Sequence, residues 1–193
     1  MIVKVDELKR IFFVTGSPGI GKTTILLKTA EALEKKGYEI GGMLSREARE
    51  KGARVGFEII DIETKKHGWL AHALQSNGPQ VGKYRVNLVD LESIGALAIR
   101  NAAVDAQIVI IDEIGPMELH SSAFKEAVTE ALSSGKPVIG VIHERAQDSL
   151  INSIKRRDDA QIILITRANR EQIHSLLIEK VNQLLQEKRH YSS

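Results

Sequence analysis

A glycine-rich loop directly after a short apolar run restricts the fold of this chain more than any other feature. The apolar run covers residues 11–14, and the pattern G-x-x-x-x-G-K-T follows as Gly16, Ser17, Pro18, Gly19, Ile20, Gly21, Lys22 and Thr23. A buried strand that enters such a loop and continues into a helix is the phosphate-binding unit of parallel α/β proteins. We therefore expect an α/β fold in which this loop lies at one edge of a mostly parallel sheet.

The residue types in this loop suit the charge of a nucleoside triphosphate. Glycines let the backbone bend so that its N–H groups converge on phosphate oxygens, and the following helix adds its positive N-terminal end. Lys22 is expected to bridge the β- and γ-phosphates, and the Thr23 hydroxyl is the expected protein ligand of Mg²⁺. The predicted nucleotide-binding segment covers residues 16–24 and so ends at Thr24.

Apolar runs alternate with helical periods along the chain. Strands are expected at 11–15, 39–45, 107–111, 137–142 and 161–165, and helices at 22–36, 88–103, 121–133, 147–156 and 170–188. This alternation indicates a parallel sheet covered by helices on both faces. Glycines divide residues 46–86 into short strand-like pieces, which we interpret as a β-hairpin inserted on the edge of the sheet. Residues 1–193 are expected to form a single domain.

A second apolar run ends in two carboxylates. The apolar residues are Ile108, Val109, Ile110 and Ile111, the acids are Asp112 and Glu113, and Ile114 and Gly115 follow. Ligands of open parallel sheets bind at the carboxyl ends of the strands, so both acids should lie near Thr23. Asp112 is then placed to orient Mg²⁺, and Glu113 to accept a hydrogen bond from the attacking water. The alternative is that the acidic pair only caps the next turn.

The acidic pair also separates two kinds of reaction. An enzyme that transfers phosphate to a bound acceptor can rely on the acceptor's hydroxyl, whereas an enzyme that activates water needs a base beside the metal. Glu113 therefore favours hydrolysis. Two alternatives stay open, a nucleoside or nucleotide kinase and a regulatory, nucleic-acid-associated ATPase. The basic run 155–157 is the one hint of nucleic acid; it also fits a lid over the phosphates or a solvated helix end.

Composition excludes several classes of protein. With 27 basic and 25 acidic residues the net charge is +2, so nucleic-acid binding is neither indicated nor excluded. The absence of cysteine excludes disulfides, thiolate metal sites and a thiol nucleophile. No apolar stretch has the length of a signal peptide or a membrane span. We expect a cytoplasmic monomer without membrane contact, with nucleoside triphosphates as its ligands.

Several segments together resemble a known family. These are residues 16–24 and the stretch Asp-Glu-Ile-Gly-Pro-Met-Glu-Leu at 112–119, with similar segments at 54–59, 81–84, 137–140 and 154–157. They resemble the small nucleoside-triphosphatase family first described from thermophiles, also called the cancer-related nucleoside triphosphatase family. The resemblance implies a RecA-like P-loop core. It also implies slow, Mg²⁺-dependent hydrolysis of several nucleoside triphosphates, ATP and GTP among them, to the diphosphate and phosphate.

Four further residues are candidates for contact with the nucleotide. His143 and Arg145 follow the expected strand 137–142, where they can approach the γ-phosphate; the alternative for His143 is a strand-end side chain bonded to a backbone carbonyl. The family would have a basic residue at position 144, where this chain has Glu144. Arg167 and Asn169 follow the last expected strand and are candidates for holding the base. Arg46, Arg49 and Arg54 either close over the nucleotide or form a charged hairpin edge.

Overall fold

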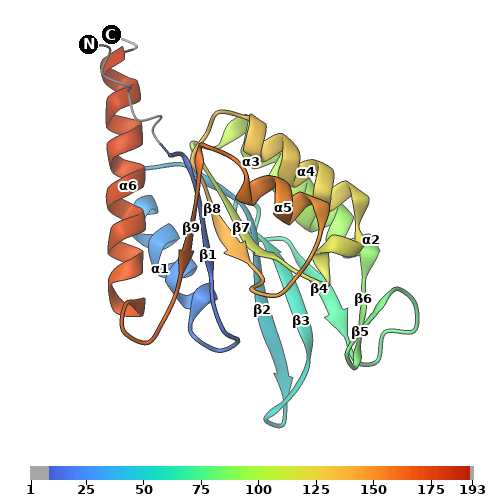
Figure 1. The fold of residues 1–193 in the computed structure, drawn as a ribbon. Coiled ribbons are helices and arrows are strands. Elements are labelled where there is room, and N and C mark those ends of the chain that lie inside the picture. Colours follow the sequence, from blue (N-terminus) through green and yellow to red (C-terminus); the bar gives the residue numbers. More distant parts are fainter. Residues whose placement is uncertain (1–8, 192–193) are drawn as a thin grey trace.

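The computed structural model describes the backbone of residues 9–191 and the side chains of residues 9–187. The described strands form one nine-stranded sheet in the order β5-β6-β4-β3-β2-β7-β8-β1-β9 (Figure 1). The strands are β1 Ile11–Thr15, β2 Ile40–Glu50, β3 Ala53–Asp61, β4 His67–His72, β5 Gln80–Val81, β6 Tyr84–Val86, β7 Ile108–Ile114, β8 Val138–Ile142 and β9 Ala160–Leu164.

Helices cover both faces of the parallel part of the sheet (Figure 1). One face carries α1 Lys22–Glu34 and α6 Arg170–Tyr191; the other carries the π-helix η1 Leu91–Ala96, α3 Leu97–Asp105, α4 Ser122–Ser133 and α5 Ser149–Lys155. The remaining helical segments are the short turns α2 Leu88–Asp90 and η2 Glu118–His120. The predicted α/β fold with helices on both faces is confirmed.

The five strands β2, β7, β8, β1 and β9 run parallel. Their residues face alternately into two separate apolar cores, because successive strand residues point to opposite faces. Ile110 and Phe12 belong to the core under α1 and α6, whereas Ile111 and Phe13 belong to the core under α3 and α4. Burial on both faces explains why these strands read as continuous apolar runs.

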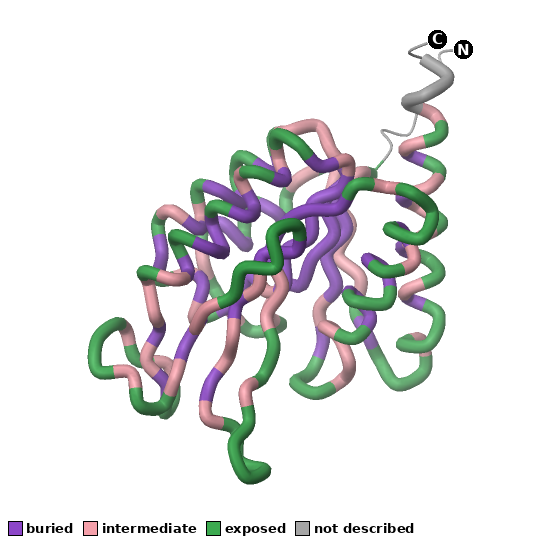
Figure 2. Tube along the Cα trace, turned by 180° about the vertical axis from the view of Figure 1, so that it is seen from behind, coloured by how far each residue is buried: buried purple, intermediate pink, exposed green. Residues whose placement is uncertain are grey.

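The inserted segment is larger than the single hairpin predicted at 46–86. β2 continues without a break to Glu50 and pairs with β3 in an antiparallel hairpin, and β4, β6 and β5 extend the same sheet. β5 and β6 have no signal in the sequence, because strands of two and three residues are too short to show an alternating pattern. The tip of the β2–β3 hairpin is exposed and projects past the carboxyl ends of β7 and β8 (Figures 1 and 2).

Helix boundaries agree with the sequence within a few residues, apart from the helix predicted at 88–103. That segment is helical but contains the π-helix η1 between α2 and α3. The predicted cap of the following helix is present, since the Ser121 hydroxyl accepts a hydrogen bond from the Phe124 N–H at 3.1 Å. Among the described residues, no helix combines the length and the apolar character that crossing a bilayer requires.

Candidate active site

The phosphate loop connects the end of β1 to the start of α1. Gly16 has a φ of +146°, and a Cβ atom there would lie 2.8 Å from the carbonyl oxygen of Ile165, so the position requires glycine. Gly21, directly before α1, has a φ of +105°, and a Cβ added there would meet no atom within 4 Å. Ser17, Pro18 and Gly19 are exposed. The loop is therefore anchored at its first glycine and exposed from Ser17 to Gly19, while Ile20 packs against the apolar core.

Lys22 folds back over this loop. Its Nζ atom donates to the carbonyl oxygens of Gly16 at 2.8 Å and Ser17 at 3.3 Å, and the side chain is half-buried. The ammonium group is thus held at the mouth of the loop by the loop's own backbone. A cation in this position can attract the charge of a phosphate group.

Thr23 connects the phosphate loop to the end of β7. Its hydroxyl donates to Oδ1 of Asp112 at 3.3 Å, across 89 positions of sequence. β1 and β7 are not neighbours, because β8 lies between them, but all three strands are parallel and end at the same edge. The structure therefore brings together the two motifs that the sequence placed at one site.

Asp112 is buried with an unsatisfied oxygen. The residue is 1% exposed, and Oδ2 has no hydrogen-bond partner among the described residues. Burial and the negative charge of Glu113 raise the pKa of Asp112 to about 7, against the effects of Thr23, the Ser45 backbone and Lys22. A buried carboxylate oxygen without a partner beside a threonine hydroxyl is a pair of hard oxygen ligands that fits Mg²⁺.

Glu113 follows directly and is half-buried, and its Oε1 atom also lacks a partner among the described residues. The strand ends one residue later, where the backbone carbonyl of Ile114 accepts a hydrogen bond from the His143 N–H at 3.0 Å. That bond ties the loop after β7 to the loop after β8. Glu113 is thus an unsatisfied carboxylate at the same edge as Lys22 and Thr23.

Glu118 is a buried acid to which the sequence reasoning gave no role. It is 5% exposed, and its Oε2 accepts a hydrogen bond from the Gly115 N–H at 3.1 Å. Burial, followed by the negative charge of Glu113, raises the pKa of Glu118 to about 8. The available signal was a glutamate three residues after a glycine that directly follows a strand, because this spacing lets the side chain reach back to the glycine N–H.

The weaker candidates lie in the loops after β8 and β9. His143 Nδ1 accepts the Arg145 N–H at 3.2 Å, and the Arg145 side chain is exposed. Asn169 shapes its own loop, since Oδ1 accepts the Thr166 N–H at 2.8 Å and Nδ2 donates to the Leu164 carbonyl at 2.9 Å. Arg167 is exposed. All four residues follow strands of the parallel sheet, and their contacts with a nucleotide stay predictions.

Other charged segments lie away from the phosphate loop or are paired. Arg157 binds Asp159 and the Leu132 carbonyl, and Asp159 also binds Arg10. Arg10 and Asp159 directly precede β1 and β9, so Arg157 lies at the opposite edge of the sheet. The interpretation of 155–157 as a lid over the phosphates is therefore wrong. The hairpin arginines form ion pairs within the hairpin, between Arg46 and Glu58 and between Glu47 and both Arg49 and Arg54.

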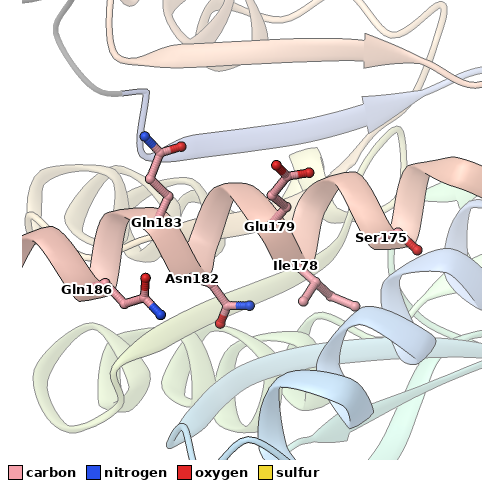
Figure 3. A pocket seen from close by; sticks show the side chains of 6 residues that line it. All are labelled: Ser175, Ile178, Glu179, Asn182, Gln183 and Gln186. Carbon is pink, nitrogen blue, oxygen red and sulfur yellow. The ribbon is translucent and has the colours of Figure 1, made fainter.

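A surface hollow lies elsewhere, along α6. It is lined by Ser175, Ile178, Glu179, Asn182, Gln183 and Gln186, which project from several turns of the helix (Figure 3). The sequence predicted none of these as a site residue. The candidate active site is instead the edge where Lys22, Thr23, Asp112 and Glu113 meet.

Comparison with known proteins shows the family of this chain. The sequence profile of the NTPase family matches residues 11–178. The chain is 46% identical over 175 residues to nucleoside-triphosphatase THEP1 of Thermofilum pendens, covering 90% of this chain and 96% of that protein. It is 47% identical over 161 residues to the THEP1 protein of Methanosarcina acetivorans, covering 83% and 90%. The chain belongs to this nucleoside-triphosphatase family.

Solved structures of relatives share the fold of this nucleoside triphosphatase. The crystal structure of THEP1 from the hyperthermophile Aquifex aeolicus has a TM-score of 0.75 and 29% identity, covering 89% of this chain and 98% of that one. The solution structure of a human cancer-related nucleoside triphosphatase has a TM-score of 0.74 and 32% identity, covering 91% and 97%. The resemblance inferred from residues 16–24 and 112–119 is confirmed.

Proposed function

We propose that this nucleoside triphosphatase hydrolyses ATP, GTP and other nucleoside triphosphates to the diphosphate and phosphate, slowly and with Mg²⁺. The observation that carries the proposal is the hydrogen bond from Thr23 to the buried Asp112, because it joins a phosphate-binding loop to the strand end that carries Asp112 and Glu113. The family name of the relatives supports hydrolysis of a nucleoside triphosphate. The metal, the range of substrates and the slow turnover belong to the proposal.

The phosphate loop binds the triphosphate. The backbone N–H groups of residues 16–24 and the start of α1 surround the phosphates, and Lys22 leaves the carbonyls of its own loop to bridge the β- and γ-phosphates. Thr23 and Asp112 would hold Mg²⁺ through their side-chain oxygens. When bound, the ion neutralises the charge that develops on the phosphate oxygens.

Glu113 activates the water that attacks the γ-phosphate. Its carboxylate accepts a hydrogen bond from the attacking water and aligns the water with the γ-phosphorus. A new bond forms between the water oxygen and phosphorus as the bond to the β-phosphate oxygen breaks, and the proton of the water passes towards Glu113. The unsatisfied Oε1 of Glu113 supports this role, because a buried acceptor without a protein partner has capacity for a water molecule.

We further propose that the enzyme acts as a cytoplasmic monomer and that residues 1–193 form one domain, with 46–86 as an insertion. Free nucleotides are then the substrates and no membrane takes part, whereas a nucleic-acid partner is neither indicated nor excluded. The paired charges at Arg157 and on the β2–β3 hairpin support this view, since both sets of side chains are engaged within the chain.

A phosphate-release assay tests the function. The purified enzyme is incubated with ATP, GTP, CTP or UTP in Mg²⁺ and in EDTA, and Glu113→Gln is carried through in parallel to reveal contaminating phosphatase. We expect Mg²⁺-dependent release of phosphate from each triphosphate, and about a 10²- to 10⁴-fold slower rate in Glu113→Gln. Equal rates in the two proteins would contradict the assigned role of Glu113.

The same incubations separate the alternatives. A panel of nucleosides and nucleoside monophosphates is added, and the products are resolved by chromatography. A phosphorylated acceptor would indicate a kinase, whereas a strong increase of phosphate release by RNA or DNA would indicate a regulatory ATPase. Phosphate release that is independent of every addition is the result we expect.

A further inference from the structure

The chain reverses direction immediately after β7, and Glu118 holds this reversal together. Its Oε2 accepts the Gly115 N–H at 3.1 Å, and the Leu119 N–H donates to the Gly115 carbonyl at 3.0 Å. Both backbone groups of Gly115 are therefore fixed from the same short helical turn, η2. Glu118 is 5% exposed, although a glutamate that reaches back in this way commonly lies on the surface.

Gly115 is also the point where three functional segments meet. A Cβ atom placed on it would lie 3.2 Å from Glu118 Oε2, 3.4 Å from His143 Cβ and 3.5 Å from Glu113 Cδ. The Glu118 and Glu113 carboxyl groups thus adjoin the same buried glycine. Gly115 carries no side chain, so nothing at position 115 separates the two acids.

We infer that Glu118 is a positioning residue for Glu113. By fixing the backbone of Gly115, which adjoins the Glu113 carboxyl group, it holds the carboxylate that activates water in one direction. The inference rests on the proposed function, because it requires Glu113 to act on water. A water-activating group loses much of its effect when displaced by about 1 Å, so the support of Glu113 should appear in the rate of the chemical step.

The neutral acid form of Glu118 fits this arrangement. Burial raises the pKa of Glu118, and the negative charge of the nearby Glu113 raises it further. A glutamine has the same shape, is neutral, and can accept the Gly115 N–H through its amide oxygen. An aspartate keeps the acid but is one methylene too short for the contact at 3.1 Å. Reach and charge can therefore be separated by substitution.

The experiment compares Glu118→Gln, Glu118→Asp and Glu118→Ala with Glu113→Gln and the control Ser121→Ala. Ser121 caps α4 from the same segment and is 1% exposed, so its variant measures the effect of losing a nearby buried cap. Steady-state kcat and KM for ATP are measured below the unfolding temperature of each variant. Thermal midpoints are recorded alongside.

We expect Glu118→Gln to retain kcat within about threefold, and Glu118→Asp and Glu118→Ala to lower kcat roughly 10- to 100-fold at nearly unchanged KM. Ser121→Ala should lower the thermal midpoint but keep kcat. The inference is overturned if Glu118→Asp keeps the wild-type kcat, if Glu118→Gln loses as much as Glu118→Asp, or if Ser121→Ala lowers kcat equally. If Glu113→Gln is inactive while Glu118→Asp is fully active, only this inference is wrong. If Glu113→Gln is active, the proposed function is wrong as well.

Discussion

The two halves of the active site, the phosphate loop and the acids at and after the end of β7, differ in solvent exposure. In the phosphate loop, Ser17 to Gly19 are exposed, and a Cβ at Gly19 or Gly21 would meet no atom within 4 Å. At the end of β7, Asp112 is 1% exposed and Glu118 is 5% exposed. One half is an open backbone surface, and the other is a packed group of acids.

This difference indicates a division of labour. An anion can bind to backbone N–H groups that face solvent, and the loop needs little tertiary support for that task. Buried carboxylates are costly, and the raised pKa values of Asp112 and Glu118 reflect that cost. This cost is offset where a bound cation neutralises the carboxylate or a reacting water donates a hydrogen bond to it. Changes in the open half should therefore alter binding, and changes in the buried half should alter the rate of chemistry.

The largest contrast is expected between Lys22→Ala and Glu113→Gln. Loss of Lys22 removes charge-assisted contacts worth about 1.5–3 kcal/mol, which corresponds to roughly a 10- to 100-fold weaker affinity for the triphosphate. Glu113→Gln should bind with wild-type affinity while it hydrolyses poorly. Calorimetric titration with a non-hydrolysable ATP analogue measures both affinities. If the two variants lose affinity equally, the division between the halves is wrong.

A smaller effect is expected where the two halves touch. Thr23→Ala removes one proposed oxygen ligand and the bond to Asp112, so about a tenfold higher Mg²⁺ concentration should be needed for half-maximal phosphate release. Thr23→Ser keeps the hydroxyl and is the matched control. Mg²⁺ titrations at saturating ATP measure this requirement. Identical titration curves for Thr23→Ala and Thr23→Ser would argue against threonine as a metal ligand.

Two glycines sharpen the comparison further. Gly115→Ala places a methyl group 3.2 Å from Glu118 Oε2 and 3.5 Å from Glu113 Cδ, and should lower kcat about threefold to tenfold through displacement of Glu113. Gly19→Ala has open space but a φ of +74°, so it strains the loop and should raise KM instead. Kinetics of both variants test the assignment. A raised KM with normal kcat in Gly115→Ala would contradict it.

The last effect concerns stability and not activity. Because the folded-state pKa of Glu118 is raised to about 8, the folded protein keeps a proton that the unfolded chain releases above the ordinary value of 4.5. The free energy of unfolding should therefore fall from about pH 5 to pH 8 more steeply in the wild type than in Glu118→Gln. Asp112, Glu113 and His143 lie near this group in both proteins. Urea unfolding across this range measures the slopes, and parallel curves would refute the prediction.

Much of the fold could be predicted because its signals are local. Continuous apolar runs marked β1, β7 and β8, and Ser121 marked the start of α4. The four antiparallel strands beyond β2 were only partly foreseen, since β5 and β6 pair through tertiary contacts and carry no periodic pattern of their own. The π-helix η1 could not be told from an α-helix, because its apolar residues keep the spacing of an α-helix.

The sequence by itself determined the phosphate loop and the family, because a loop that binds phosphate through its backbone is specified by glycines, a lysine and a threonine at fixed spacing. The sequence also predicted that Asp112 lies near Thr23, and the two meet across 89 positions because β1, β8 and β7 end at one edge. Only the tertiary structure decided that Glu118 lies close to these acids. Glu118 and Glu113 both adjoin Gly115, and no local sequence pattern encodes the burial of Glu118 at this place. Desolvation depends on the packing of the whole chain, and so does the chemistry of these acids.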